Sequence, residues 1–327
     1  MIGLSPLPRA GASESRKMRW WPPLMPATMT AMDRSAITPG LASRLIATQF
    51  PQWADLPVRP VELNGWDNIT FRLGDNMSVR LPSGENYVPQ VSKEQTWLPE
   101  LAPKLPLPIP EPLAQGAPGC GYPWPWSVYR WLDGKPAVAA NVTDLGQFAA
   151  DLADFLTALY QIDTSDGPAA GYETCFFGVP LAHWDSQTRE SLAALGGQID
   201  TRLAVNVWEA ALAAAWRGPA VWFHGDISPG NLLVSQGRLS AVIDFGVSGV
   251  GDPACDTAIA WTFFSGQSRT TYQTRLAADD ATWARGRGWA LWKALITLVR
   301  VADEDPGEAA SSRRVIEAVL ADHEDAA

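Results

Sequence analysis

The pattern of apolar and polar residues predicts strands in the first third of the chain. Apolar residues alternate with polar ones over residues 68–73 and again over 77–81, so each segment would place one apolar face against a core. The link Gly74-Asp75-Asn76 between them has the composition of a hairpin turn. The apolar run Val58 to Leu63 predicts a further strand just before this pair.

Two helices and a proline-rich segment are expected around these strands. Apolar residues recur at helical spacing from Thr38 to Phe50, which predicts the first helix. A second helix is expected from Pro89 to Leu98, with a proline at its start and Pro99 just past its end. Residues 102–126 are rich in proline, which lacks the N–H that a central strand needs. We therefore expect an extended segment or an edge strand there.

The second part of the chain is predicted to be mainly helical. From Leu145 onward, apolar residues follow each other at spacings of three and four, which marks a buried helical stripe, and Asn141 would cap that helix. Further helical regions are expected at residues 191–215, 257–264, 283–301 and 312–320.

Three apolar runs of strand type lie among these helices, and polar residues stand at their ends. The runs cover residues 220–223, 232–234 and 239–243. Residues 235–238 contain glycine and polar residues, so the last two runs should form a hairpin. The triplet His224-Gly225-Asp226 follows the first run, Asn231 precedes the second, and Asp244-Phe245-Gly246 follows the third. We expect these polar groups to be held rigidly and in one place.

Two carboxylates and an amide at such positions fit phosphoryl transfer. This reaction depends on positioning and charge neutralisation, and it uses a carboxylate to orient the attacking hydroxyl group. Asp226 is the candidate for that carboxylate. Asn231 and Asp244 offer oxygen ligands of the kind that Mg²⁺ prefers.

The same two segments carry a family resemblance. HGDISPGN at 224–231 and IDFGVSGVGDPACD at 243–256 resemble the motifs of the aminoglycoside phosphotransferase family, whose fold is similar to that of protein kinases. Protein kinases themselves carry an arginine in the middle of the first triplet and an Ala-Pro-Glu segment further on, and this sequence has neither. The resemblance implies that His224 holds its loop by hydrogen bonding rather than acting as a base. It also implies that Asp256 ties the loop backbone together.

The resemblance implies an α+β, protein-kinase-like fold with two lobes. A small nucleotide-binding N-terminal lobe with an antiparallel sheet and one helix would cover residues 29–131, and a larger, mainly helical catalytic and substrate-binding lobe would cover residues 132–327. Residues 1–28 show no hydrophobic periodicity and contain several prolines, so we expect a disordered tail there.

The resemblance also implies a nucleotide site in the N-terminal lobe. The loop between the first two strands would approach the phosphates, and a cation on the third strand would bind them with an acidic partner from the following helix. Backbone groups of the segment that joins the lobes would hold the adenine. The residues that match these positions are Gly65, Trp66, Asp67 and Asn68 of the loop, Arg80 and Glu94 of the ion pair, and Arg130, Trp131 and Leu132 of the joining segment.

Composition and net charge limit the classes of partner that we expect for this protein. No apolar run reaches the length of a membrane span, so we expect no membrane association. The net charge of −10 disfavours nucleic acid as a partner and favours a cationic small molecule. Three scattered cysteines predict a reducing, cytoplasmic location without disulfides.

The sequence therefore predicts an ATP-dependent and Mg²⁺-dependent O-phosphotransferase, with GTP as the other nucleotide considered. The expected acceptor is a hydroxyl group of an aminoglycoside antibiotic, with antibiotic resistance as the associated role. Macrolides, choline, amino alcohols and other sugars stay open as acceptors, and a catalytically idle nucleotide-binding scaffold is the alternative from another class. Carboxylates and aromatic residues of the helical lobe are candidate acceptor contacts, namely Asp185, Asp279, Asp280, Asp303, Glu304, Trp261, Phe263 and Trp283.

Overall fold

The alternating segments form a five-stranded antiparallel sheet in the order β1-β2-β3-β5-β4. The computed structural model describes residues 32–62, 64–65, 67–302 and 304–326, so the expected tail lies outside the described residues. The strands are β1 (Val58–Pro60), β2 (Asn68–Leu73), β3 (Met77–Pro82), β4 (Pro112–Gly116) and β5 (Trp126–Arg130). The hairpin between β2 and β3 is confirmed, with Leu73 opposite Met77. The proline-rich segment supplies the edge strand β4, as expected.

Two helices accompany this sheet. Helix α2 (Pro39–Gln49) begins after Thr38, whose hydroxyl accepts a hydrogen bond from the Leu41 N–H. Helix α3 (Val88–Leu101) passes through Pro99, so the prediction that it ends before this proline was wrong. The helix continues because Pro99 falls in its last turn, where it removes a single hydrogen bond, and because Leu101 is buried in the core.

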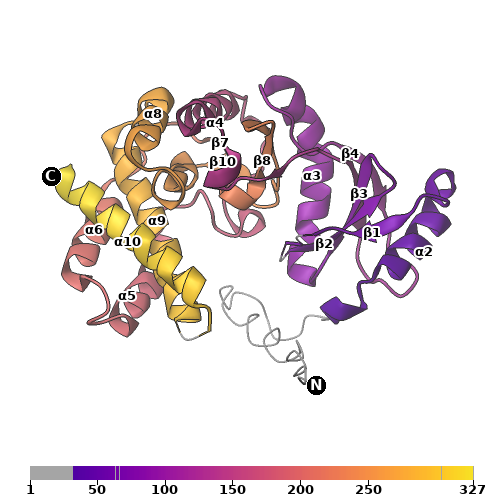
Figure 1. Cartoon of the computed structure of the whole chain (residues 1–327), viewed down its shortest axis with the longest axis horizontal. Coiled ribbons are helices and arrows are strands. Elements are labelled where there is room, and N and C mark those ends of the chain that lie inside the picture. Colours follow the sequence, from indigo (N-terminus) through magenta and orange to yellow (C-terminus); the bar gives the residue numbers. More distant parts are fainter. Residues whose placement is uncertain (1–31, 63, 66, 303, 327) are drawn as a thin grey trace, which may run out of the picture.

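The larger part of the chain is mainly helical, as predicted (Figure 1). Its helices are α4 (Leu145–Tyr160), α5 (Asp185–Ala194), α6 (Thr201–Ala213), α7 (Ile259–Thr262), α8 (Gly266–Leu276), α9 (Asp280–Val301) and α10 (Pro306–Asp325). Short strands complete it. The hairpin of β8 (Leu232–Ser235) and β9 (Arg238–Val242) is joined by β6 (Lys135–Pro136), and β7 (Val221–Phe223) pairs with β10 (Gly249–Gly251).

Two helical predictions need correction, and one helix was not predicted. Asp144 caps α4 by accepting the Gln147 N–H, whereas Asn141 ends a short 3-10 helix and bonds to the backbone of residues 136 and 138. The region 191–215 contains parts of two helices, α5 and α6, because the chain turns at Gly197 with a φ of 78°. No helix was predicted at residues 266–276, where α8 lies.

Two hydrophobic cores hold the chain together. One lies between α2 and the five-stranded sheet and contains Leu45, Phe71 and Val79. The other fills the helical part and extends to Leu98 and Leu101 of α3. Helix α3 therefore packs on both sides, and Figure 1 shows it between the sheet and the helices. We call the part from α2 to β5 the N-terminal lobe and the remainder the C-terminal lobe; the division between residues 131 and 132 stays a prediction.

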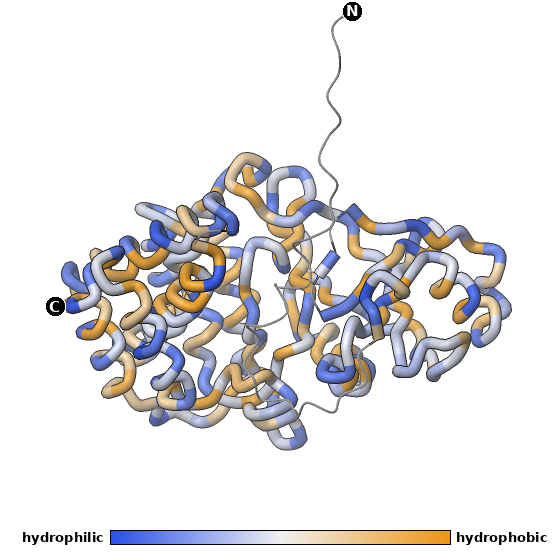
Figure 2. Tube along the Cα trace, turned by 90° about the horizontal axis from the view of Figure 1, so that it is seen from below, coloured by the Kyte–Doolittle hydropathy of each residue, from blue (hydrophilic) through white to orange (hydrophobic). Residues whose placement is uncertain are grey.

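Figure 2 shows both lobes from a second side, with apolar and polar residues alternating along the chain. Within the part of the chain that the structure describes, no helix combines the length and the apolar character that crossing a membrane requires.

Candidate active site

The polar triplet after β7 is held in a sharp loop. Gly225 has a φ of 90°, and a Cβ atom at this position would lie 3.0 Å from the Val247 carbonyl oxygen. This backbone conformation and the close carbonyl favour glycine in the middle of the triplet. Asp226 follows, and Asn231 lies in the short 3-10 helix Pro229–Asn231 before β8.

His224 and Asp256 hold this loop from inside. The Asp256 carboxylate accepts hydrogen bonds from the backbone N–H groups of His224 and Gly225, at 2.9 and 2.7 Å. The His224 Nε2 atom bonds to the Ile243 carbonyl oxygen at 3.0 Å, and its Nδ1 atom accepts the Asp226 N–H. Burial raises the pKa of Asp256 to about 7 and lowers the pKa of His224. Both residues are buried and bonded to the backbone, as the sequence predicted.

The Asp226 carboxylate is held on both oxygens. Its Oδ2 atom accepts a hydrogen bond from the Asn231 Nδ2 atom at 2.9 Å, and its Oδ1 atom lies 2.6 Å from the Nζ atom of Lys293 on α9. Burial acts to raise the pKa of Asp226, but the charge and hydrogen bond of Lys293, together with His224 and the hydrogen bond from Asn231, bring the pKa below its usual value. Asp226 is therefore ionised at neutral pH, as a proton acceptor has to be.

The predicted ion pair of the N-terminal lobe forms and reaches across to the C-terminal lobe. The Arg80 Nη1 atom lies 3.4 Å from Glu94 Oε1, and its Nη2 atom lies 3.0 Å from Asp244 Oδ1. Glu94 is buried and also accepts the hydroxyl of Tyr129. Asp244 has a left-handed backbone with a φ of 70°, which costs a residue with a side chain about 1 kcal/mol or more. Such strain is typical of functional positions.

Asn231 and Asp244 fit a hard divalent cation. The amide nitrogen of Asn231 is used by the backbone and side chain of Asp226, which leaves its carbonyl oxygen for a metal. Asp244 offers a carboxylate. Within the described ranges, no group of three or more His, Cys, Asp or Glu side chains is placed to hold a metal ion alone. A two-residue oxygen site suits Mg²⁺, which usually completes its shell with phosphate oxygens and water.

The β1–β2 loop is partly described. Gly65 has open space around its Cα atom, and its carbonyl oxygen accepts a hydrogen bond from Arg34. The Asp67 carboxylate accepts a hydrogen bond from Gln90 at 2.9 Å, and Asn68 is buried at the start of β2. The first strand ends at Pro60, so the prediction that it runs to residue 63 was wrong. Trp66 and Leu63 lie outside the described residues.

Replacing Asp67 with asparagine should stabilise the protein at neutral pH. Burial, and then the charge of Asp244, raise the pKa of Asp67 to about 6 from 3.8. Stability contributed by this group is therefore present below pH 4 and lost as the pH rises through 6. We expect Asp67→Asn to raise the free energy of unfolding by about 1–2 kcal/mol at pH 7.5 and by almost nothing at pH 4.

Thermal unfolding at both pH values measures this effect. Asp75→Asn, the same chemical change in the exposed β2–β3 turn, is the matched control. Equal changes in the melting temperature of Asp67→Asn at pH 4 and pH 7.5 would contradict the assigned cause.

Two backbone N–H groups of the segment that joins the lobes are hydrogen-bonded within the protein. The N–H of Arg130 donates to the Glu111 carbonyl oxygen, and the N–H of Trp131 donates to that of Asn76. These two N–H groups are therefore engaged within the protein. Contacts of Arg130, Trp131 and Leu132 with an adenine ring, which stay a prediction, would use their carbonyl groups and the Leu132 N–H.

Four of the eight candidate acceptor contacts have structural roles within the protein. Asp185 bonds to Arg189 and to the Trp208 indole, and Asp279 caps α9 by accepting the Thr282 N–H. Trp261 and Trp283 are buried in the core of the C-terminal lobe. Asp303 lies outside the described residues.

Two lysines near the site, Lys293 and Lys93, were not predicted. Lys293 follows Trp289 and Trp292 on α9, where the pattern indicates only a core-facing helix. Lys93 of α3 is buried and donates to the carbonyl oxygens of Glu173 and Ser248 at 2.8 and 2.9 Å. Burial lowers the pKa of Lys93 to about 8. Lys93 therefore links helix α3 to the C-terminal lobe, one residue before Glu94 of the Arg80–Glu94 pair.

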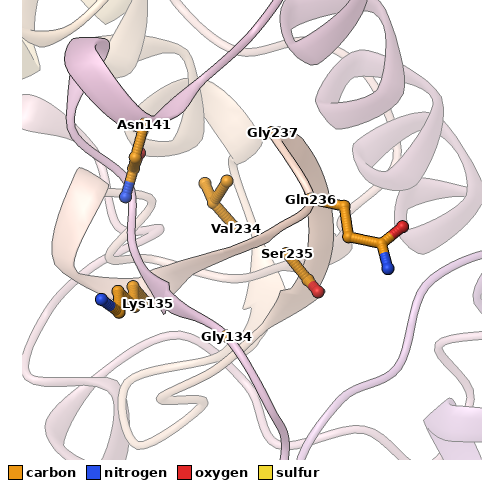
Figure 3. Close-up of a pocket in the computed structure, with 7 residues that line it drawn as sticks. All are labelled: Gly134, Lys135, Asn141, Val234, Ser235, Gln236 and Gly237. Carbon is orange, nitrogen blue, oxygen red and sulfur yellow. The ribbon is translucent and has the colours of Figure 1, made fainter.

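A surface hollow of about 410 Å³ lies beside the β8–β9 hairpin. Its lining residues are Gly134, Lys135, Asn141, Val234, Ser235, Gln236 and Gly237. Figure 3 shows Lys135 and Gln236 on opposite sides of it. None of the predicted catalytic or metal-binding residues lines this hollow, so we do not assign it to the reaction.

Residues 58–289 match the model of a family described as the phosphotransferase enzyme family. A search of curated proteins finds no match. Among solved structures, the GDP and kanamycin complex of APH(2″)-IIia is 20% identical, covers 86% of this chain and 98% of its own, and has a TM-score of 0.64.

Two further structures show the same likeness. Macrolide 2′-phosphotransferase MphH from Brachybacterium faecium is 21% identical, with 79% of this chain and 91% of its own covered and a TM-score of 0.54. The streptomycin–ATP complex of APH(2″)-IIa is 16% identical, with 85% and 97% covered and a TM-score of 0.52. At these identities the comparisons show the fold, and they confirm the protein-kinase-like α+β architecture predicted from the sequence.

Proposed function

Because this chain belongs to the phosphotransferase enzyme family, we propose that it transfers the γ-phosphoryl group of ATP to a hydroxyl group of a small molecule. The arrangement around Asp226 carries this proposal most strongly. An ionised carboxylate is held by Asn231 and Lys293, and it follows a loop that Asp256 fixes through two backbone hydrogen bonds. Such a carboxylate can orient a hydroxyl group and take its proton.

Different residues act on the acceptor and on the nucleotide. Asp226 accepts a hydrogen bond from the acceptor hydroxyl and takes its proton as the new O–P bond forms. On the nucleotide side, Glu94 orients Arg80 to bind phosphate oxygens. The β1–β2 loop covers these oxygens. Positioning and fixed charges then supply most of the acceleration.

A divalent cation fits the same place. Asn231 and Asp244 would hold Mg²⁺, which neutralises phosphate charge when it is bound. The Arg80 guanidinium group lies 3.0 Å from the Asp244 carboxylate. The proposed phosphate-binding cation and a proposed metal ligand are therefore already next to each other.

We propose an aminoglycoside as the acceptor class, with a macrolide as the second candidate. The fold is similar to enzymes solved with kanamycin or streptomycin and to a macrolide phosphotransferase. The net charge of −10 favours the cationic class. We further propose ATP or GTP as the donor and, from three free thiols, a cytoplasmic location.

Release of nucleoside diphosphate tests this function. The purified chain would be mixed with ATP or GTP, Mg²⁺ and a panel of aminoglycosides, macrolides and amino alcohols. We expect release that depends on the acceptor and is confined to one class. Binding of nucleotide without acceptor-dependent release from any member of the panel would instead favour an idle scaffold.

Replacing Arg80 with methionine should weaken nucleotide binding. The change removes a charge-assisted contact to phosphate, which is worth about 1.5–3 kcal/mol, so we expect the KM for ATP to rise about 10- to 100-fold. Arg80→Lys keeps the charge but loses the forked guanidinium group that contacts both Glu94 and Asp244. Its KM for ATP should lie between the values of the unaltered chain and of Arg80→Met. Initial rates at varied ATP measure the effect. Arg59→Met, on the exposed strand β1, is the matched control, and an unchanged KM in Arg80→Met would exclude this role.

A further inference from the structure

Lys293 enters the site from a distant part of the chain. It lies on α9, 67 residues from Asp226, and its Nζ atom is 2.6 Å from Asp226 Oδ1. The two side chains are 48% and 33% exposed, so water and substrates reach this pair. Ion pairs as open as this one contribute little to stability. Stability alone therefore does not explain why a lysine meets the carboxylate proposed to take the acceptor's proton.

The contact leaves room for the acceptor hydroxyl. Each carboxylate oxygen has two acceptor positions. Asn231 uses one on Oδ2 and Lys293 uses one on Oδ1. A hydroxyl group bound to Asp226 would thus lie next to the Lys293 ammonium group. The phosphoryl group that this hydroxyl attacks would approach the same ammonium group.

Cations close to the transferring group accelerate phosphoryl transfer. Charge spreads over the three equatorial oxygens of the transferring group. Segment 227–230, between Asp226 and Asn231, reads Ile-Ser-Pro-Gly and supplies no cation. Arg80 is engaged with Glu94 and Asp244 on the nucleotide side, and Lys93 is buried against two carbonyl groups. Among the described residues, Lys293 is the cation paired with Asp226.

We propose that Lys293 binds the transferring phosphoryl group from the acceptor side. This role rests on the proposed function. The acceptor oxygen forms a bond to the γ-phosphorus, the bond from that phosphorus to the bridging oxygen breaks, and the nucleoside diphosphate leaves with the bonding electrons. The hydroxyl proton passes to Asp226. This proton neutralises the partner of Lys293, so the ammonium group, which stays protonated throughout, is released toward the oxygens of the new phosphate ester.

Steady-state kinetics of three variants test the role. Lys293→Met keeps most of the side-chain length and removes the charge, and we expect kcat to fall about 100-fold while the KM for ATP and for the acceptor change less than about threefold. Lys293→Arg keeps the charge and should recover kcat to within about tenfold of the unaltered chain. Arg275→Met removes the cation of another exposed ion pair, the one between Arg275 of α8 and Asp154, and should leave kcat unchanged.

Lys293 and Arg275 are both exposed, so all three variants should keep the melting temperature within about 3 °C, and a fall in kcat then does not come from lost stability. Unchanged kcat in Lys293→Met, or an equal loss in Lys293→Met and Lys293→Arg, would overturn the proposal. A higher KM for the acceptor with unchanged kcat would assign Lys293 to acceptor binding and would also overturn it. Absence of transfer by the unaltered chain would overturn the proposed function, and this role with it.

Discussion

Replacing Asp226 with asparagine lowers kcat by about 10²- to 10⁴-fold if this carboxylate takes the proton of the acceptor hydroxyl. Asparagine keeps the shape and can still bond to Asn231, but its amide cannot take a proton. The KM for ATP should change little, since Arg80, the proposed phosphate ligand, pairs with Glu94 and Asp244 and not with Asp226. Initial rates at saturating acceptor and varied ATP measure both quantities.

A matched replacement on the same lobe controls for the loss of a carboxylate. Asp151→Asn removes a charge from α4, where Asp151 pairs with the exposed Arg238. This variant should keep the kcat of the unaltered chain. If Asp226→Asn retained more than about a tenth of kcat, general-base catalysis by Asp226 would be excluded.

Replacing Asp252 with alanine should have the largest effect on stability. Asp252 and Arg285 form a bidentate pair, with Oδ2 to Nε at 2.6 Å and Oδ1 to Nη2 at 3.1 Å, and their side chains are 6% and 4% exposed. Removing one partner leaves a buried charge without compensation, which costs about 3–5 kcal/mol. We expect the melting temperature to fall by about 10 °C.

Two further variants separate the buried charge from other effects. Glu308→Ala removes the partner of Arg300 in a more exposed pair and should cost less than about 1 kcal/mol. The double variant Asp252→Leu with Arg285→Leu removes both buried charges and should recover part of the loss. A loss of less than 1 kcal/mol in Asp252→Ala would show that Arg285 finds other partners, such as Thr282 and the Ala214 carbonyl oxygen.

The polar residues that follow strands could be placed from the sequence. Asp226, Asn231 and Asp244 stand at the ends of three short apolar runs, and those runs became β7, β8 and β9. The alternation in β3 puts Arg80 on the face opposite Val79, where it meets Glu94. The local pattern places each of these residues on its strand or helix, whereas the pairing of Arg80 with Glu94 came from the family resemblance.

Long-range partners could not be placed in this way. Lys293 and Arg285 lie on α9 beside buried tryptophans, and nothing local to the helix indicates that they reach Asp226 and Asp252. Helix α8 escaped prediction because only three of its residues are buried and two of those, Ser268 and Tyr272, are not aliphatic. Tertiary packing decides such features, and one sequence does not contain the pairing.

Transfer of labelled phosphate to the acceptor tests the central proposal most directly. The chain would be incubated with ATP labelled on the γ-phosphate, Mg²⁺ and the acceptor that gives the fastest nucleoside diphosphate release, and the acceptor would be analysed by mass spectrometry. We predict that the acceptor gains one labelled phosphoryl group as an ester and that Asp226→Asn forms almost none. Nucleoside diphosphate that accumulates with labelled inorganic phosphate and an unmodified acceptor would contradict the proposal and show hydrolysis instead.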